Sequence, residues 1–196
     1  FLKSGIECDF VINATMDQFH YETTMEILGA GYDLLVEKPI VPNEKELLDI
    51  KNLAEKKGVR VFVCHVLRYS PFYTKIKEIL NSGIIGKIMT MEMNEHVCRQ
   101  HYLASYDRGK WNSEDGCGSG FLLAKCCHDM DIMCWLNNAS APETVASMGG
   151  RCEFVKGNMP EDASEFCYEC KYNETCIYSA MHEYLDLHVM PFLVWD

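Results

Sequence analysis

The feature that most constrains the fold is the alternation of strand-like and helix-like segments through the first third of the chain. Residues 8–14, 32–36 and 59–65 are short, mostly apolar runs typical of buried strands. Residues 17–28 have helical periodicity, and a second helix is expected from the cap Asn43 to Gly58. The resulting order of strand, helix, strand, helix and strand requires crossover connections, so we expect a doubly wound parallel sheet of the α/β class.

The pattern changes near residues 66–70, and the remainder has the mixed character of an α+β domain. Ser70-Pro71 opens a helix that Gly83 ends, and an apolar helix is expected at 121–136. Residues 98–119 have the composition of a polar loop. Two segments alternate like antiparallel strands, 86–97 and 144–155. We therefore expect one domain over residues 1–67 and a second, with a mainly antiparallel sheet, over residues 68–196.

Charge and cysteine content narrow the class of partner. The chain has 18 Lys+Arg and 29 Asp+Glu, a formal net charge of −11, which disfavours nucleic acids and anionic membranes. No apolar run is long enough to span a bilayer, and no signal-peptide pattern opens the chain. The eleven cysteines are odd in number, and several lie in apolar runs. We expect a cytoplasmic protein with reduced thiols that binds a small molecule or another protein.

One basic residue stands where a doubly wound fold binds its ligand. Glu37-Lys38-Pro39 follows the second predicted strand, and ligands of such folds lie at the carboxyl ends of the strands. Lys38 would then face the ligand crevice, and Pro39 would stiffen the backbone that presents it. The alternative is a surface lysine that precedes a turn.

Four segments, in order, resemble the Gfo/Idh/MocA family of oxidoreductases. The first is Val11-Ile12-Asn13-Ala14-Thr15 with Asp17 and His20, and the second is Glu37-Lys38-Pro39. The third is His65-Val66-Leu67-Arg68-Tyr69-Ser70-Pro71, and the fourth runs from Leu122-Leu123 to His128-Asp129-Met130-Asp131. The resemblance implies the C-terminal half of a Rossmann-like domain followed by the family's substrate domain.

The resemblance also implies that part of the family's sequence is missing. No G-x-G-x-x-G pyrophosphate loop occurs, so the chain is expected to be a fragment that enters at the family's fourth strand and stops before its last strands. Residues 1–196 alone are then expected to bind the dinucleotide weakly and to show no turnover. The intact protein is expected to be a homo-oligomer.

By the same resemblance, the protein is an oxidoreductase that uses NAD or NADP and acts on a sugar, inositol or related polyol. Lys38 and His128 would handle the hydroxyl proton while hydride passes to the cofactor. The implied cofactor residues are Ala14, Thr15, Asp17, His20, Glu37, Lys38 and Pro39, and the implied substrate residues include Arg68, Tyr69 and Asp131. Two rival functions stay open: a lyase or glycosidase that oxidises its substrate only transiently, and a catalytically silent binding protein.

The helix that carries His128 departs from the family pattern. Many dehydrogenases of the family have Asp four residues before this histidine, and here that residue is Ala124. Lys125 lies roughly on the face of His128 and would favour an anionic substrate. The alternatives are a solvated Lys125 and a His128 that is only a structural helix residue.

Two further constellations suggest binding sites. Residues 101–111, which include Arg108 and Trp111, mix aromatic, cationic and hydroxyl groups in a way that suits a sugar, although a structural crossover loop has the same composition. Cys152-x14-Cys167-x2-Cys170-x5-Cys176 is compatible with structural zinc or an iron–sulfur cluster. Free thiols in a reducing compartment are the alternative.

Overall fold

The chain forms two compact units, each of which is described by itself. The computed structural model describes residues 2, 4 and 7–187. The first unit is Phe1–His96 with Lys110–Ala139, and the second is Val97–Gly109 with Ser140–Asp196.

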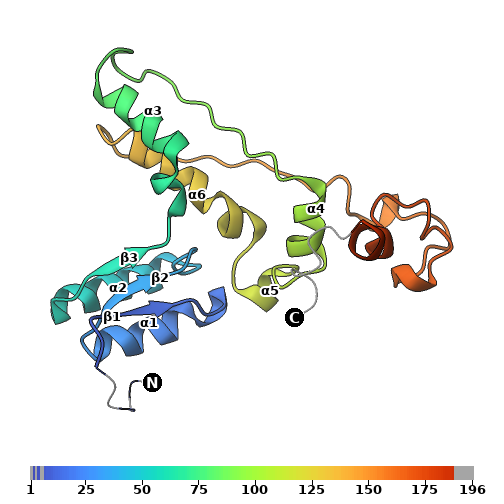
Figure 1. The fold of residues 1–196 in the computed structure, drawn as a ribbon, viewed down its shortest axis with the longest axis horizontal. Helices are drawn as coiled ribbons and strands as arrows, with labels where there is room; N and C mark the ends of the chain where they lie inside the picture. Colours follow the sequence, from blue (N-terminus) through green and yellow to red (C-terminus); the bar gives the residue numbers. More distant parts are fainter. Residues whose placement is uncertain (1, 3, 5–6, 188–196) are drawn as a thin grey trace. The chain divides into compact units, whose positions relative to one another are not determined.

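The first unit contains a three-stranded parallel sheet in the order β1-β2-β3 (Figure 1). Its strands are β1 (Phe10–Asn13), β2 (Asp33–Val36) and β3 (Val61–Val63). Because all three run in the same direction, their carboxyl ends share one edge. The parallel sheet predicted from the alternating pattern is confirmed.

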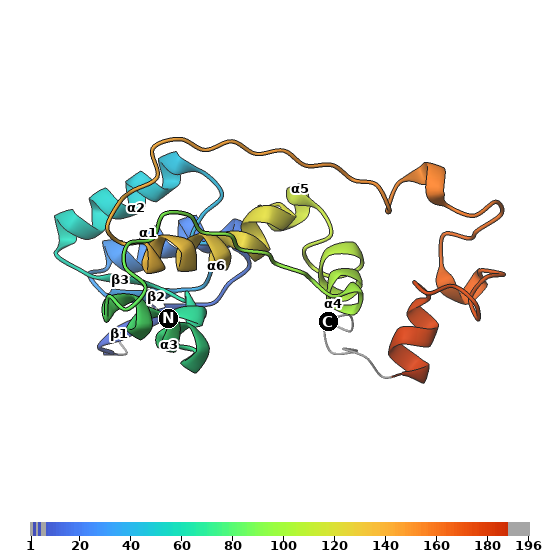
Figure 2. The same cartoon turned by 90° about the horizontal axis from the view of Figure 1, so that it is seen from above.

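Two crossover helices cover one face of this sheet. Helices α1 (His20–Gly29) and α2 (Glu44–Lys57) contact each other, as Figure 2 also shows. Their buried side chains pack with those of β2 in one apolar cluster, formed by Ile27, Leu28, Leu34, Val36, Val41, Ile50 and Ala54. On the other face Phe10, Ile12 and Phe62 are each more than half exposed.

Local sequence signals set the helix ends. The Asn43 side chain accepts a hydrogen bond from the Glu46 amide at 3.0 Å and caps α2, and Gly58 ends it in the left-handed conformation at φ 68°. Helix α3 (Pro71–Asn81) begins with Pro at its first turn, and the Ser70 side chain accepts from the Tyr73 amide. These caps were predicted from the sequence.

Helix α6 (Phe121–Leu136) packs against two other elements of the first unit. It contacts α3 and the 3₁₀ turn η2 (Val66–Tyr69). Lys77 of α3 donates to the carbonyl of Trp135 at 2.6 Å, which satisfies the carboxyl end of α6. Two short elements complete the first unit, η1 (Asp17–Phe19) and α5 (Glu114–Cys117).

The second unit has little regular structure among its described residues. It contains α4 (Arg99–Tyr102), the π-helical turn η3 (Leu103–Asp107), the 3₁₀ turns η4 (Lys156–Asn158) and η5 (Cys167–Glu169), and the π-helical turn η6 (Met181–Asp186). Leu103, Ala104 and Tyr184 are buried in it. The carboxylate of Glu183, also buried, accepts from Arg99 at 2.6 Å.

Three sequence expectations differ from the structure. Residues 98–119, expected as a loop, contain α4, η3 and α5. Residues 86–97 and 144–155, expected as strands, lie wholly within the described part of the chain and contain no strand. An alternating pattern makes a segment suitable for a sheet, but a strand forms only where a neighbour pairs with its backbone groups. No antiparallel pairing therefore occurs among the described residues.

Within residues 2, 4 and 7–187, no helix combines the length and the apolar character that a bilayer span requires.

Candidate active site

Lys38 lies at the carboxyl edge of the sheet and reaches α6. It lies two residues beyond the end of β2, and its half-buried side chain donates from Nζ to the backbone carbonyl of Ala124 at 2.9 Å. Glu37 continues the strand contact, since its amide donates to the Asn13 carbonyl at 3.0 Å. An ammonium group has three N–H donors, so the bond to Ala124 leaves two for other partners.

His128 lies one helical turn beyond Ala124 on α6. Its Nδ1 atom is buried and, among the residues that the structure describes, has no hydrogen-bond partner. Burial lowers the pKa of His128, and the positive charges of Lys38, His65 and Lys125 lower it further. The imidazole is therefore held in its neutral, proton-accepting form beside Lys38.

A second imidazole lies next to His128. The rings of His65 and His128 meet edge to face, with centroids 6.2 Å apart and an interplanar angle of 70°. His65 Nδ1 lies 3.0 Å from one carboxylate oxygen of Asp131. The Asp131 carboxylate also accepts two hydrogen bonds from Arg68, one of them from Nε at 2.7 Å. Burial lowers the pKa of His65, while Asp131 opposes the shift.

The sequence analysis predicted Arg68, Asp131 and His128 as site residues but not His65. A signal was present, because His65 follows β3 as Lys38 follows β2, and both therefore stand at the same edge of the parallel sheet. Tyr69, predicted beside Arg68, is instead 83% exposed.

Lys125 is paired within the first unit. Its Nζ lies 3.3 Å from Glu95, and both side chains are about two-thirds or more shielded from solvent. Burial and the nearby Glu95 raise the pKa of Asp129. Lys125 thus contributes a positive charge near His128 that a carboxylate already balances in part.

The turn after β1, expected to contact a dinucleotide, is held by buried polar side chains. The Asn13 side chain accepts from the amide and hydroxyl of Thr15 and donates to Thr23 and Thr24. Ala14 and Thr15 are exposed at the sheet edge, and Asn13 is buried. The exposed backbone of this turn can therefore meet a ligand while its base stays fixed.

Asp17 and His20, which follow this turn in the chain, are both buried. Asp17 is buried and accepts from the Ser119 hydroxyl and from Trp111 Nε1, the latter at 3.4 Å. His20 is fully buried, with its ring nitrogens 2.8 Å from the carbonyl of Pro39 and 2.9 Å from that of Thr15. His20 thus ties the turn after β1 to the cis-linked Pro39 after β2.

Arg108 and Trp111, the two residues of 101–111 predicted to bind a sugar, belong to different units. Trp111 belongs to the first unit, where it bonds Asp17. Arg108 belongs to the second unit, where it donates to the Tyr184 hydroxyl at 3.2 Å and to the Tyr178 carbonyl.

The four-cysteine metal site is not formed, and this prediction is corrected. Among the described residues, which include Cys152, Cys167, Cys170 and Cys176, no cluster of His, Cys, Asp or Glu is arranged to hold a metal ion. Cys167 Sγ accepts from the Ala180 amide, and Cys152 is exposed. A spacing along the chain defines a metal site only where the backbone gathers the thiolates around one centre.

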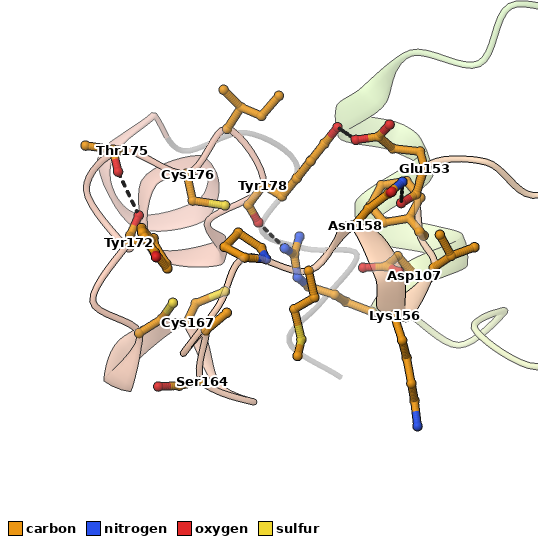
Figure 3. A pocket seen from close by; sticks show the side chains of 18 residues that line it. Asp107, Glu153, Lys156, Asn158, Ser164, Cys167, Tyr172, Thr175, Cys176 and Tyr178 are labelled. Carbon is orange, nitrogen blue, oxygen red and sulfur yellow. Dashed lines mark hydrogen bonds between the residues drawn. The ribbon is translucent and has the colours of Figure 1, made fainter.

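Cys167, Cys170 and Cys176 line a cavity within the second unit. This cavity has a volume of about 680 Å³. Figure 3 shows Cys167 and Cys176 on its wall together with Tyr172 and Tyr178, and the Tyr178 hydroxyl donates to Glu153 at 2.7 Å. Its lining is largely aromatic, aliphatic and thiol.

Two cavities of the first unit adjoin His65. One of about 520 Å³ is lined by Pro39, His65, Asp131 and by apolar and thiol side chains of α6. The other, of about 550 Å³, lies along β3 and η2. Burial raises the pKa of the Cys126 and Cys127 thiols on the first cavity, so these groups act as small apolar linings rather than nucleophiles.

The histidine geometry predicts a loss of stability in acid. Because the folded pKa of His128 lies below its ordinary value of 6.5, the unfolded chain binds a proton that the folded chain does not, once the pH falls below 6.5. The contribution of His128 to the free energy of unfolding is therefore constant above pH 6.5 and decreases as the pH falls below that value. We expect the free energy of unfolding, measured by urea titration between about pH 7.5 and pH 5, to decrease less in His128→Gln than in the wild type. The exposed His96→Gln serves as control and should retain the wild-type dependence. An unchanged dependence in His128→Gln would contradict the burial argument.

Comparison with known proteins places this geometry in context. The family profile described as "Oxidoreductase family, NAD-binding Rossmann fold" of GFO_IDH_MocA matches residues 1–65. The profile described as "GFO/IDH/MocA C-terminal domain" matches residues 73–171.

Individual relatives agree with these matches. YteT of Bacillus subtilis is 28% identical over 87% of this chain and 40% of its own length. The inositol 2-dehydrogenase/D-chiro-inositol 3-dehydrogenase of Lactiplantibacillus plantarum is 28% identical over 66% of this chain and 34% of its own length. The chain thus spans two fifths or less of the length of these relatives.

Solved structures share the fold. The myo-inositol 2-dehydrogenase of Lactobacillus plantarum superposes with a TM-score of 0.59 at 21% identity, over 68% of this chain and 39% of that protein. The WlbA dehydrogenase of Bordetella pertussis, solved in complex with NADH and UDP-GlcNAcA, superposes with a TM-score of 0.55 at 25% identity, over 69% and 38%.

Proposed function

Because the chain belongs to the Gfo/Idh/MocA family of oxidoreductases, we propose that the protein carrying it is an NAD- or NADP-dependent dehydrogenase of a sugar, inositol or related polyol. The observation that carries the proposal is the meeting of Lys38, from the edge of the sheet, with the turn of α6 that bears His128. The relative named as an inositol dehydrogenase supports the substrate class.

Proton handling follows from these two side chains. The two N–H groups of Lys38 that Ala124 leaves unused would donate to a substrate hydroxyl and stabilise the negative charge that grows on its oxygen. His128, held neutral by its lowered pKa, would accept the hydroxyl proton. A buried Nδ1 leaves Nε2 as the ring nitrogen for the substrate.

The sheet edge fits a dinucleotide. The exposed turn of Ala14 and Thr15, with Glu37, Lys38 and Pro39 after the next strand, would hold it, while Asp17 and His20 would shape the turn after β1 from below. The bound nicotinamide ring would supply the hydride acceptor. Arg68, Tyr69, Lys125 and Asp131 remain candidates for substrate contact, with Arg108 and Trp111 in separate units.

We also propose a cellular compartment and an oligomeric state for the protein. All eleven cysteines are free thiols, which supports a reducing cytoplasm. We further propose that the intact protein is a homo-oligomer.

The test is to incubate the protein that carries this chain with NAD⁺ or NADP⁺ and a panel of inositols, aldoses and uronic acids. We expect one reduced dinucleotide for each substrate molecule oxidised. Conversion of substrate without net reduced dinucleotide would identify the lyase or glycosidase class instead. Ligand binding without any conversion would indicate a silent binding protein.

A further inference from the structure

We propose that His65 is a relay residue that passes the hydroxyl proton from His128 towards solvent. The inference rests on the proposed function, since it assumes that His128 receives a proton from the substrate. It adds a residue that acts only through His128 and that was not predicted from the sequence.

The backbone fixes His65 beside the site. Beyond β3, the Cys64 amide still donates to the Val36 carbonyl at 2.9 Å, and the His65 amide donates to that of Val63 at 2.7 Å. The turn η2 begins at the next residue. The position of the His65 ring is therefore set by the same strand ladder that sets Lys38.

Asp131 fixes the tautomer of the His65 ring. A carboxylate can only accept, so the His65 Nδ1 that lies 3.0 Å from Asp131 must carry the hydrogen. Asp131 is itself held by two hydrogen bonds from Arg68, and its side chain is only 8% exposed. His65 Nε2 is then the acceptor nitrogen, and the imidazolium that forms on protonation is stabilised by Asp131.

The proton donor in this relay is the Nδ1 atom of His128. Nδ1 of this ring is buried and has no hydrogen-bond partner among the described residues, an arrangement that costs free energy in the resting protein. The ring centroids lie 6.2 Å apart, and a small rotation of the His128 ring would bring this buried nitrogen within reach of one water that also contacts His65. His128 would gain the substrate proton at Nε2, lose the proton of Nδ1 through the water, and leave His65 positively charged.

Charges around the two rings allow the proton to move in either direction. Lys38 and His65 face His128 with positive charge, as does Lys125, while Asp129 opposes them. Arg68 and Lys38 face His65 with positive charge, and Asp131 opposes them. The His65 side chain is 21% exposed and lines both adjoining cavities, so its proton has a route to solvent.

The first experiment needs no activity. The ring signals of ¹³C-labelled histidines in the chain are followed by NMR against pH, in the wild type and in His65→Gln. We expect His65→Gln to raise the proton affinity of His128 by roughly ten- to 100-fold, as Coulomb's law gives for unit charges about 6 Å apart at effective dielectric constants of about 40 to 20. The exposed His96→Gln should leave the His128 titration unchanged. An unchanged His128 titration in His65→Gln would overturn the relay, because it would mean that the two rings do not sense each other.

The second experiment uses the protein that carries this chain, with a substrate found in the panel. His65→Ala should lower kcat by about 10- to 100-fold with little change in KM, and added imidazole should restore much of the loss. A kcat that imidazole does not restore would reject the relay, since a purely structural role of His65 offers nothing for free imidazole to replace. If the wild type oxidises no polyol, the proposed function fails, and the NMR coupling still decides whether the two rings form a pair.

Discussion

Replacing Lys38 by Met is expected to lower kcat of the protein that carries this chain by about 10³-fold, the range typical of a lost acid–base or charge-stabilising group. The Nζ of Lys38 contacts the α6 backbone at Ala124 and retains N–H donors for the substrate oxygen. Met preserves the length of the side chain but offers neither a charge nor a donor. The measurement is steady-state dehydrogenation, followed by the formation of reduced dinucleotide.

The control is Lys75→Met, because Lys75 is an exposed lysine of α3 that pairs with Glu78 at the surface. Its kcat and KM should match the wild type. If Lys38→Met raised KM and left kcat unchanged, Lys38 would only bind the ground state of the substrate, and its proposed role in the proton step would be wrong.

Local elements of the fold were predictable because their signals lie in neighbouring residues. Asn43 caps α2 with its own side chain, Gly58 supplies the positive φ that ends it, and Pro71 opens α3. Helix α6 occupies 121–136, the bounds expected from its apolar run. Each of these features depends on chemistry within about one helical turn.

Pairing over long distances was harder to predict. Residues 86–97 and 144–155 alternate as strands do, yet neither forms one in the structure. Side-chain alternation reports which face a segment can bury, while the hydrogen bonds of a strand depend on a partner elsewhere in the chain. The cysteine spacing failed for the same reason, since Cys152 and Cys167 do not share a centre in space.

The candidate site lies between these two cases. Lys38 and His128 were predicted through family resemblance, and the contact between Lys38 and Ala124 joins positions 86 residues apart. His65 was missed because its place after a strand, which matches that of Lys38, does not show which side chains of α6 approach it. Its importance emerges only when Asp131 and His128 approach it from α6.

The second large effect is expected from Asp131→Ala, which should lower the free energy of unfolding by about 2 kcal/mol, less than the loss of one partner of a fully buried ion pair because Arg68 is 39% exposed. Asp131 is almost fully buried and accepts hydrogen bonds from Arg68 and His65, so its loss leaves both of these groups without their acceptor. Urea unfolding with an unchanged m-value measures the effect. The exposed Asp9→Ala is the control and should change stability by less than about 0.5 kcal/mol.

A double variant separates the cost of unpaired groups from the loss of packing. In Arg68→Met/Asp131→Leu neither charged partner remains, and apolar side chains of similar volume fill the space between η2 and α6. Since most of the expected cost comes from leaving Arg68 without its carboxylate, this variant should be more stable than Asp131→Ala alone. If the double variant were the less stable of the two, the ion pair itself would be a net source of stability, and the cost of Asp131→Ala could not be attributed to an unpaired Arg68.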